Sequence, residues 1–251
     1  AASRWWLHHS LEDLGRSLRQ RGSRLIVRRG PTLEVLLALV RETGAGAVFW
    51  NRRYEPAVVA RDTRIKEALT SAGVRAESFN GALLNEPWTI RNQSGKPFQV
   101  FTPFWRACLS GPEPGASAPA PASLAAPRVW PDGDSLDRLG LLPAIPWDVE
   151  MRKAWRPGEA GAKANLDRFV SEAVGDYAID RNRPDRRGTS RLSPHLHFGE
   201  IGPRQIWEVV REASKKAGAS WEEWRKGQFL AEVGWREFAH HLLFHFPHTP
   251  E

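Results

Sequence analysis

Charged and hydroxyl side chains gather between residues 177 and 201, in the C-terminal half of the 251-residue chain. Five arginines fall between positions 181 and 191, and the run GTSRLSP occupies 188–194. Serine followed by proline, here Ser193-Pro194, is typical of a helix start, with serine as the cap and proline in the first turn. Hydroxyls, free backbone N–H groups and the helix dipole together favour an anion such as phosphate. The alternative is a capped loop whose arginines are simply solvated, and the pattern alone does not decide between the two.

A second set of side chains lies in FLAEVGWREF, residues 229–238. At helical spacing Glu232 shares a face with Trp235 and Arg236, and Phe229 lies one turn earlier. An acid, an indole and a guanidinium on one face could hydrogen-bond and stack an extruded base, which base-handling enzymes hold between polar groups and an aromatic wall. The alternative is an ion pair between Glu232 and Arg236 beside a core tryptophan, and the pattern alone favours that alternative.

The histidines do not form a recognised metal motif. His241 and His245 have i, i+4 spacing, but no Glu or Cys completes a zinc motif such as HExxH. The single cysteine, Cys108, excludes an internal disulfide framework, favours a reduced compartment and is expected to be buried packing. We therefore predict no metal site. The histidines are assigned to helix surfaces or satisfied interior positions: His195, His197, His240, His241, His245 and His248.

Composition points to a basic protein with many indoles. The chain has 36 lysines and arginines against 29 acids, a net charge of +7 and a pI near 10.1, which suits a polyanionic partner. Twelve tryptophans against two tyrosines fit a protein that stacks on planar ligands. No apolar run approaches membrane-spanning length, and the N-terminus lacks the order of a signal peptide. We expect a cytoplasmic protein without a membrane partner or an obligate protein partner.

The elements that must position these residues change type along the chain. The first 81 residues alternate helical and strand patterns, which predicts a parallel sheet covered by helices. Because the chain begins on a helix without a preceding strand, we expect that at least one leading βα unit is absent. The predicted elements are a helix at 7–18, a strand at 24–30 ending in a turn, a helix opening at Pro31, a buried strand at 47–51, a helix opening at Pro56 and a strand at 75–81.

The second half of the chain follows a long linker and is predicted to be helical. Residues 111–127 are rich in Pro, Ala, Gly and Ser with almost no charge, so they read as a linker. Beyond about residue 158 strand patterns vanish and amphipathic stripes follow one another. The last helix is predicted to open at a capping box of Ser220 and Glu223 and to run to Pro247. The chain stops four residues later, which suggests truncation.

Taken together, these motifs resemble a known family. GTSRLSPHLHFGEI followed by PRQIW, and then WREFAHHLLFHFPH, is similar to the helical flavin domain of the DNA photolyase and cryptochrome superfamily. GKPFQVFTPFWRAC (95–108) and NRRYEP (51–56) are similar to its α/β domain. The resemblance is specifically to bacterial class I cyclobutane pyrimidine dimer photolyases. It implies an internal fragment with three parts: an incomplete Rossmann-like parallel α/β antenna domain lacking its first βα unit (1–110), an interdomain linker (111–157) and the first part of a truncated helical FAD- and DNA-binding domain (158–251).

The resemblance also implies roles for individual residues. Reduced FAD would donate an electron to a pyrimidine dimer in DNA after absorbing light, and the full-length parent would be a deoxyribodipyrimidine photo-lyase. Arg181 would contact a DNA phosphate, Glu232 would hydrogen-bond a thymine carbonyl, and Trp235 would stack on the dimer, so Glu232 and Trp235 are the implied catalytic residues. Arg236 and Ala239 complete the implied DNA- and lesion-binding set. The implied FAD-binding residues are Tyr177, Thr189, Ser190, Arg191, Leu192, Ser193, Phe229 and Arg236.

Three departures from the family pattern limit these expectations. Phe229 stands where many relatives have Trp, which keeps an apolar wall but removes an N–H donor. Pro56 follows Tyr54-Glu55 where folate-using members carry an Asn-Glu pair, so a folate antenna is doubtful and a deazaflavin is possible. The electron-relay tryptophans of the family would lie beyond residue 251, so the fragment itself is expected to be inactive. A cryptochrome-type FAD photoreceptor without repair activity is the alternative function.

Overall fold

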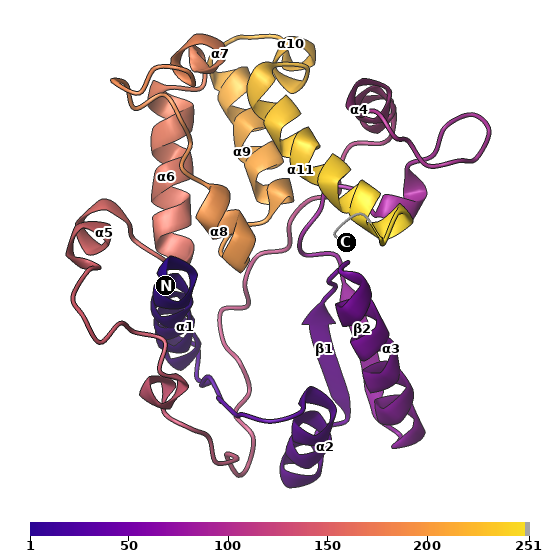
Figure 1. Ribbon diagram of the computed structural model, residues 1–251, viewed down its shortest axis with the longest axis vertical. Helices are drawn as coiled ribbons and strands as arrows, with labels where there is room; N and C mark the ends of the chain where they lie inside the picture. Colours follow the sequence, from indigo (N-terminus) through magenta and orange to yellow (C-terminus); the bar gives the residue numbers. More distant parts are fainter. Residues whose placement is uncertain (249–251) are drawn as a thin grey trace. The chain divides into compact units, whose positions relative to one another are not determined.

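A computed structural model describes residues 1–248 of the chain (Figure 1). It is mostly helical, with a small two-stranded parallel sheet. The chain divides into two compact units, and each of them is built from separate stretches of sequence. The first unit contains residues 1–50, 61–79 and 118–162, and the second contains 51–60, 80–117 and the chain from 163 onward. The predicted combination of α/β and helical parts is confirmed at this level, whereas the three domain boundaries stay a prediction.

The sheet of the first unit has the predicted strand–helix–strand order. Strands β1 (Ala47–Asn51) and β2 (Arg75–Phe79) flank helix α3 (Pro56–Ser71). The Arg75 N–H donates to the Gly46 carbonyl at 3.0 Å, so the two strands start at the same end, as a parallel pair does. Helices α1 (Ala2–Gln20) and α2 (Thr32–Thr43) precede the strands. The core that holds this sheet consists of Ile65, Leu69 and Val74, packed against Leu33, Leu36, Leu37, Val40, Val48, Trp50 and Ala76.

Two predictions for this unit are wrong. Residues 24–30 form no strand in the described structure, because their backbone makes single hydrogen bonds, such as Asp134 N–H to the Val27 carbonyl at 2.8 Å, and not a continuous ladder. The predicted burial of 47–51 also fails, since Phe49 is 53% exposed and packs edge-on against Phe79, which is 51% exposed. An apolar run does not reveal whether one face of a strand or both are covered.

The expected linker holds short helical elements. A 3₁₀ turn, η2 (Leu136–Leu139), and helix α5 (Val149–Ala154) lie within 111–157. Residues 111–127, whose composition predicts a linker, have neither helix nor strand, and neither do residues 128–135. The elements of the second unit begin with the 3₁₀ turn η1 (Pro87–Thr89) and helix α4 (Phe101–Ser110). None of the described helices is long and apolar enough to cross a membrane.

Only helices follow residue 158 in the described chain, as predicted. Helix α11 contacts α4, α7, α10 and η1, so it is central to the second unit. Cys108 on α4 is buried there, and burial raises the pKa of its thiol to about 12. The helices are α6 (Glu159–Glu172), α7 (Tyr177–Asp180), α8 (Ser193–Phe198), α9 (Pro203–Lys216), α10 (Trp221–Arg225) and α11 (Gln228–His245).

Two predicted helix starts need correction. The helix expected from Ser220 to Pro247 is two helices, because Gly227 has an extended backbone (φ −69°, ψ 162°) between α10 and α11. Ser220 precedes α10 without a side-chain capping bond, so the predicted capping box does not form. Helix α8 does start at the serine-proline pair, but Leu192 occupies the cap position and Ser193 is the first helical residue. The serine hydroxyl thus makes no capping bond.

Candidate functional site

The basic turn between α7 and α8 is fixed from two sides. Arg168 on α6 donates to the carbonyls of Arg187 and Thr189, at 3.1 and 2.7 Å. A Cβ at Gly188 would lie 2.5 Å from the Cβ of Asp180, so only glycine allows the turn to pack this closely on α7. The turn is therefore held in one conformation by α6 and α7, although most of its side chains are exposed.

Three arginines of this region repel one another. Partial burial, and then the charges of Arg187 and Arg168, lower the pKa of Arg191. Arg191 is also the one non-glycine residue with positive φ (55°) among those described, a conformation that costs free energy for a residue with a Cβ. Gathered cations favour an anion, because a bound anion offsets their mutual repulsion, and strained backbone conformations cluster at functional sites. The turn is therefore a candidate site for an anion.

The hydroxyl residues of the turn line its path into α8. Thr189 and Ser193 are exposed and Ser190 is half-buried, so their hydroxyls are accessible to a ligand. Leu192 between them is 2% exposed and anchors the turn in the core. The structure thus places the predicted residues from Thr189 to Ser193 on one fixed turn beside the arginine cluster.

Aromatic rings of α6, α7 and α11 pack against one another. The Phe229 ring is 5.3 Å from Tyr177 and 4.4 Å from Phe169, measured between centroids. Phe229 is buried and Tyr177 is half-buried, and burial raises the pKa of the Tyr177 hydroxyl. The two predicted flavin contacts therefore meet, and together they offer an apolar wall.

Glu232 pairs with Arg181 in the described structure, and not with Arg236. Arg181 donates to Glu232 Oε1, which also accepts from Gln228 Nε2 at 2.6 Å. The hydrogen bond to Glu232 is the first cause of the raised pKa of Arg181. The side chains are 30% and 32% exposed, and a pair in that setting contributes only about 0–1 kcal/mol. The sequence alternative of a Glu232–Arg236 pair is wrong.

Trp235 is a surface residue, so the alternative of a core tryptophan is also wrong. One face of its indole stacks on Phe101 of α4, with centroids 3.8 Å apart and planes 11° apart, and the side chain is 48% exposed. Gly234 lets α4 lie close to α11, because a Cβ there would lie 2.6 Å from the Trp105 ring. The half-exposed indole is thus held rigidly and can stack on a planar group. Ala239, one turn later, is exposed as well.

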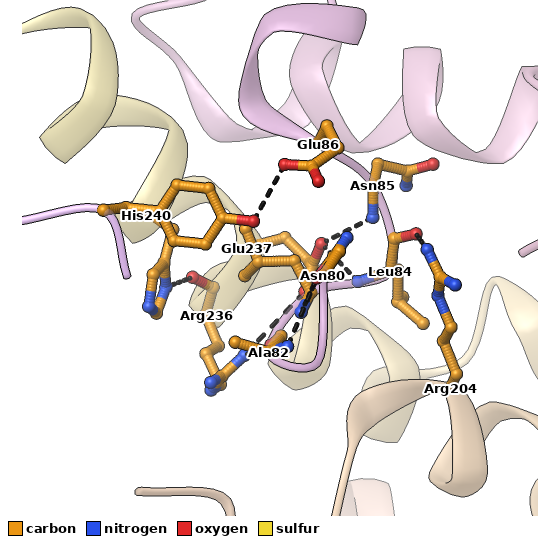
Figure 2. Close-up of polar contacts among 11 residues, drawn as sticks. Asn80, Ala82, Leu84, Asn85, Glu86, Arg204, Arg236, Glu237 and His240 are labelled. Atoms are coloured by element: carbon orange, nitrogen blue, oxygen red, sulfur yellow. Dashed lines mark hydrogen bonds and ion pairs between the residues drawn. The ribbon is translucent and has the colours of Figure 1, made fainter. Parts of the chain in front are cut away.

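Arg236 points toward the loop at 80–86 (Figure 2). Its guanidinium donates to the Ala82 carbonyl, and Arg204 donates to the Leu84 carbonyl at 3.4 Å. Burial lowers the pKa of Arg236. The contacts described for Arg236 therefore tie α11 to this loop, and they do not bring it to the residues on the turn or to Tyr177.

Sequence reasoning missed Glu237, the next residue, which is 3% exposed. Its Oε2 accepts the backbone N–H groups of Leu84 and Asn85, at 2.9 and 3.1 Å (Figure 2). Desolvation raises the pKa of Glu237 to about 7, against the opposing effect of those two hydrogen bonds. Its Oε1 has no hydrogen-bond partner among the described residues. Glu237 belongs to the opposite face of α11 from Glu232, and its place in the sequence gave no sign of burial.

Several other polar groups also complete the tie between α11 and the N-terminal segments of this unit. Tyr54 of the NRRYEP motif donates to Glu86 at 2.8 Å, and its ring packs edge-on against His240. His241 is 1% exposed, its Nε2 accepts the Phe98 N–H at 3.1 Å, and burial first of all lowers its pKa to about 4. These contacts explain why the motifs at 51–56 and 95–108 accompany WREF: they pack on the same helix.

His195 is a satisfied interior histidine, as the sequence predicts. It is 0% exposed, with Nδ1 against Glu200 and Nε2 3.1 Å from Asn165. His197, on the same short helix, is exposed. Neither these two residues nor the histidines of α11 gather into a set of three potential metal ligands within the described part of the chain.

Comparisons with known proteins agree with this arrangement. A family model for DNA photolyase matches residues 1–124. The chain is 43% identical over its whole length to a deoxyribodipyrimidine photo-lyase of Agrobacterium fabrum, of which it covers 52%. It is 35% identical over 99% of its length to Cryptochrome-1 of Arabidopsis thaliana, of which it covers 37%. The chain belongs to the DNA photolyase and cryptochrome family.

Solved structures give the same result for the fold. A crystal structure of a bacterial class III photolyase from Agrobacterium tumefaciens matches 98% of the chain with a TM-score of 0.92 and 43% identity, over 50% of that structure. A cryptochrome from Synechocystis, at 21% identity and a TM-score of 0.79 over 96% of the chain and 50% of that structure, shows the fold alone. The chain thus spans about half the length of the relatives it matches.

Proposed function

We propose that the protein containing this chain repairs cyclobutane pyrimidine dimers in DNA by light-driven electron transfer from reduced FAD. The observation that carries the proposal is the surface of α11, where the rigid, half-exposed Trp235 lies one turn from Glu232. An aromatic wall beside a polar group is what base-handling enzymes present to an extruded base. Relatives named deoxyribodipyrimidine photo-lyase support the assignment.

We base the photolyase subclass of this protein on its relatives and not on its sequence motifs. The sequence motifs suggest a class I photolyase, whereas the solved structure at 43% identity is titled a class III photolyase. We therefore place the protein in class III. The two Arabidopsis cryptochromes at 35% identity keep a photoreceptor without repair activity as the alternative, which the experiment below distinguishes.

The flavin is assigned to the turn and the aromatic wall. The arginine cluster with Thr189, Ser190 and Ser193 would hold the diphosphate, and Tyr177 and Phe229 would line the apolar side. When bound, FAD supplies the electron that opens the cyclobutane ring. The second chromophore stays open: Pro56 after Tyr54-Glu55 disfavours folate, and a deazaflavin is compatible.

Lesion binding would use residues that contact other side chains when no DNA is bound. Trp235 would stack on the dimer with its exposed face, and Arg181 would leave Glu232 for a DNA phosphate. Because the Arg181–Glu232 ion pair contributes little free energy, replacing Glu232 by a phosphate as the partner of Arg181 requires little free energy. The freed Glu232 carboxylate can accept an N–H of a pyrimidine, and it can donate to a pyrimidine carbonyl only when protonated.

The test uses the full-length protein purified in the dark. We expect a flavin absorption spectrum, and restoration of thymines in a dimer-containing oligonucleotide under blue or near-UV light but not in darkness. Flavin without light-dependent repair would support the cryptochrome alternative. A colourless protein that cannot be loaded with FAD would overturn both.

A further inference from the structure

Helix α1 of the first unit carries a group of potential metal ligands that the sequence motifs did not reveal. His8, His9 and Glu12 each offer one ligand atom, and these atoms all lie within 4.8 Å of one another. His9 Nδ1 is 3.2 Å from Glu12 Oε2. Two ligands of one tetrahedral ion with bonds of about 2.0–2.2 Å are separated by about 3.3–3.6 Å, so this pair is slightly closer together than an ion between them would require.

The imidazoles have ring nitrogens that no described group satisfies. His8 is 7% exposed, and its buried Nδ1 has no hydrogen-bond partner; the buried Nε2 of His9 has none either. Buried polar atoms in folded proteins are normally bonded, because leaving one without a partner costs free energy. A buried, unsatisfied imidazole nitrogen on His8, next to a second imidazole and a carboxylate, indicates a place for a ligand that binds nitrogen.

The surroundings hold the ligands in place. The His9 ring packs edge-on against Trp5, with centroids 4.6 Å apart, and against His8 at 5.2 Å. Trp5 is 1% exposed, and its indole N–H donates to Asp148 at 2.8 Å. Fixed neighbours of this kind orient metal-binding histidines, since they restrict the rotation of the ring.

A cavity of about 260 Å³ provides access, and His9 and Glu12 form part of its wall. Three arginines also line it, but two of them are neutralised: Arg16 pairs with Asp13 at 3.1 Å and Arg152 with Asp148 at 2.7 Å. The third, Arg156, would favour an anion such as chloride or phosphate as an additional ligand. A cation can therefore reach the histidines without facing three uncompensated charges.

We propose that His8, His9 and Glu12 form a site for one divalent transition-metal ion, with Zn²⁺, Ni²⁺ or Cu²⁺ as the class of ligand. Two imidazoles and one carboxylate suit these ions, whereas Mg²⁺ and Ca²⁺ prefer oxygen ligands alone. Three protein ligands leave a fourth position open toward the cavity. The site is independent of the flavin and lesion residues, all of which belong to the second unit.

The experiment measures Zn²⁺ binding by calorimetry on the metal-free chain, with any purification tag removed. We expect one Zn²⁺ per chain, no binding of Mg²⁺, and a tetrahedral visible spectrum when Co²⁺ replaces Zn²⁺. His9→Ala and Glu12→Gln should each weaken binding by at least the roughly 10- to 100-fold that follows loss of an outer partner of a metal ligand. His8→Ala with His9→Ala should remove stoichiometric binding.

His197→Ala is the matched control, because His197 is an exposed histidine of the second unit, and it should leave Zn²⁺ affinity unchanged. Far-UV circular dichroism checks that each variant is folded. Glu12→Gln keeps the test valid if a histidine variant unfolds, since it preserves size at a residue whose side chain is 53% exposed. Absence of stoichiometric Zn²⁺ binding by the unmodified chain would overturn the proposal. Unchanged affinity in both His9→Ala and Glu12→Gln would overturn it as well.

Discussion

Glu232 and Glu237 lie on the same helix, α11, in different surroundings. The Glu232 side chain is 32% exposed and pairs with Arg181, whereas that of Glu237 is 2% exposed and accepts two backbone N–H groups of the loop at 80–86. The first carboxylate can change partners at little cost, but the second cannot leave without exposing buried donors. One face of α11 is thus partly exposed, whereas the other is fixed to the loop.

The largest expected effect is on stability. Glu237→Ala should lower the free energy of unfolding by about 2–5 kcal/mol, because the N–H groups of Leu84 and Asn85 would be buried without an acceptor. Glu232→Ala on the exposed face should change it by roughly 0–1 kcal/mol. Urea unfolding followed by circular dichroism measures both. Equal losses in the two variants would contradict the contrast between the faces.

The second prediction concerns the pH dependence of that stability. The pKa of Glu237 is about 7 in the folded chain against an ordinary 4.5, so between these pH values the folded state holds a proton that the unfolded state has released. Its contribution to stability therefore falls as pH rises through this window, by roughly 3 kcal/mol in total. The glutamine side chain of the Glu237→Gln variant does not titrate, so the variant lacks this pH-dependent contribution. Relative to the unmodified chain, the variant should gain about that amount of stability between pH 4.5 and 7.

His241 makes the comparison with the variant necessary. Its pKa falls from 6.5 to about 4 on folding, so its contribution to stability rises with pH between those values. The two residues oppose each other, and the stability of the unmodified chain alone would not reveal either. Urea unfolding of both proteins at several pH values isolates Glu237 by difference. Parallel pH profiles for the two proteins would show that Glu237 does not titrate as described.

The smallest expected change in free energy is that of lesion binding. In the full-length protein, Trp235→Ala should weaken binding to dimer-containing DNA about 5- to 150-fold, since stacking on an aromatic side chain is worth about 1–3 kcal/mol per base. Bound FAD should stay near normal, because Trp235 contacts Phe101 and not the turn at 188–193. Fluorescence anisotropy with damaged DNA and flavin absorbance measure the two effects.

Arg181→Ala serves as the control for that measurement. It should weaken binding to damaged and undamaged DNA alike, and lower the salt dependence by about one unit, because one phosphate contact is lost. If Trp235→Ala instead removes the flavin and leaves lesion affinity intact, the assignment of this face is wrong.

Local sequence patterns predicted the elements that depend on local signals. The strand at 47–51 follows from its apolar run, the strand at 75–79 from the alternation of strand and helix patterns, and the start of α8 at Ser193 from the serine-proline pair. The segment at 24–30 also contains an apolar run, yet its partners, residues 131–134, lie about a hundred residues away. Pairing between distant segments is not encoded in the local pattern, so the strand prediction failed there.

The same limit applies to the site. Helical spacing predicted that Glu232 and Trp235 share a face, and the structure confirms that both are accessible. Spacing could not show that Arg181 is the partner of Glu232, or that Glu237 is buried, because both facts depend on contacts with α7 and with the loop at 80–86. The family was recognisable because the motifs that pack together on α11 occur together in the sequence.

Cys108 makes the anchoring of α4 on α11 measurable over time. The thiol is the single one in the chain, and with a pKa near 12 it carries almost no thiolate while α4 stays packed. An alkylating reagent therefore reacts only when this part of the second unit opens, so the labelling rate counts opening events. The labelling rate of the cysteine thus measures how often the pair of helices α4 and α11, which carries Trp235, opens.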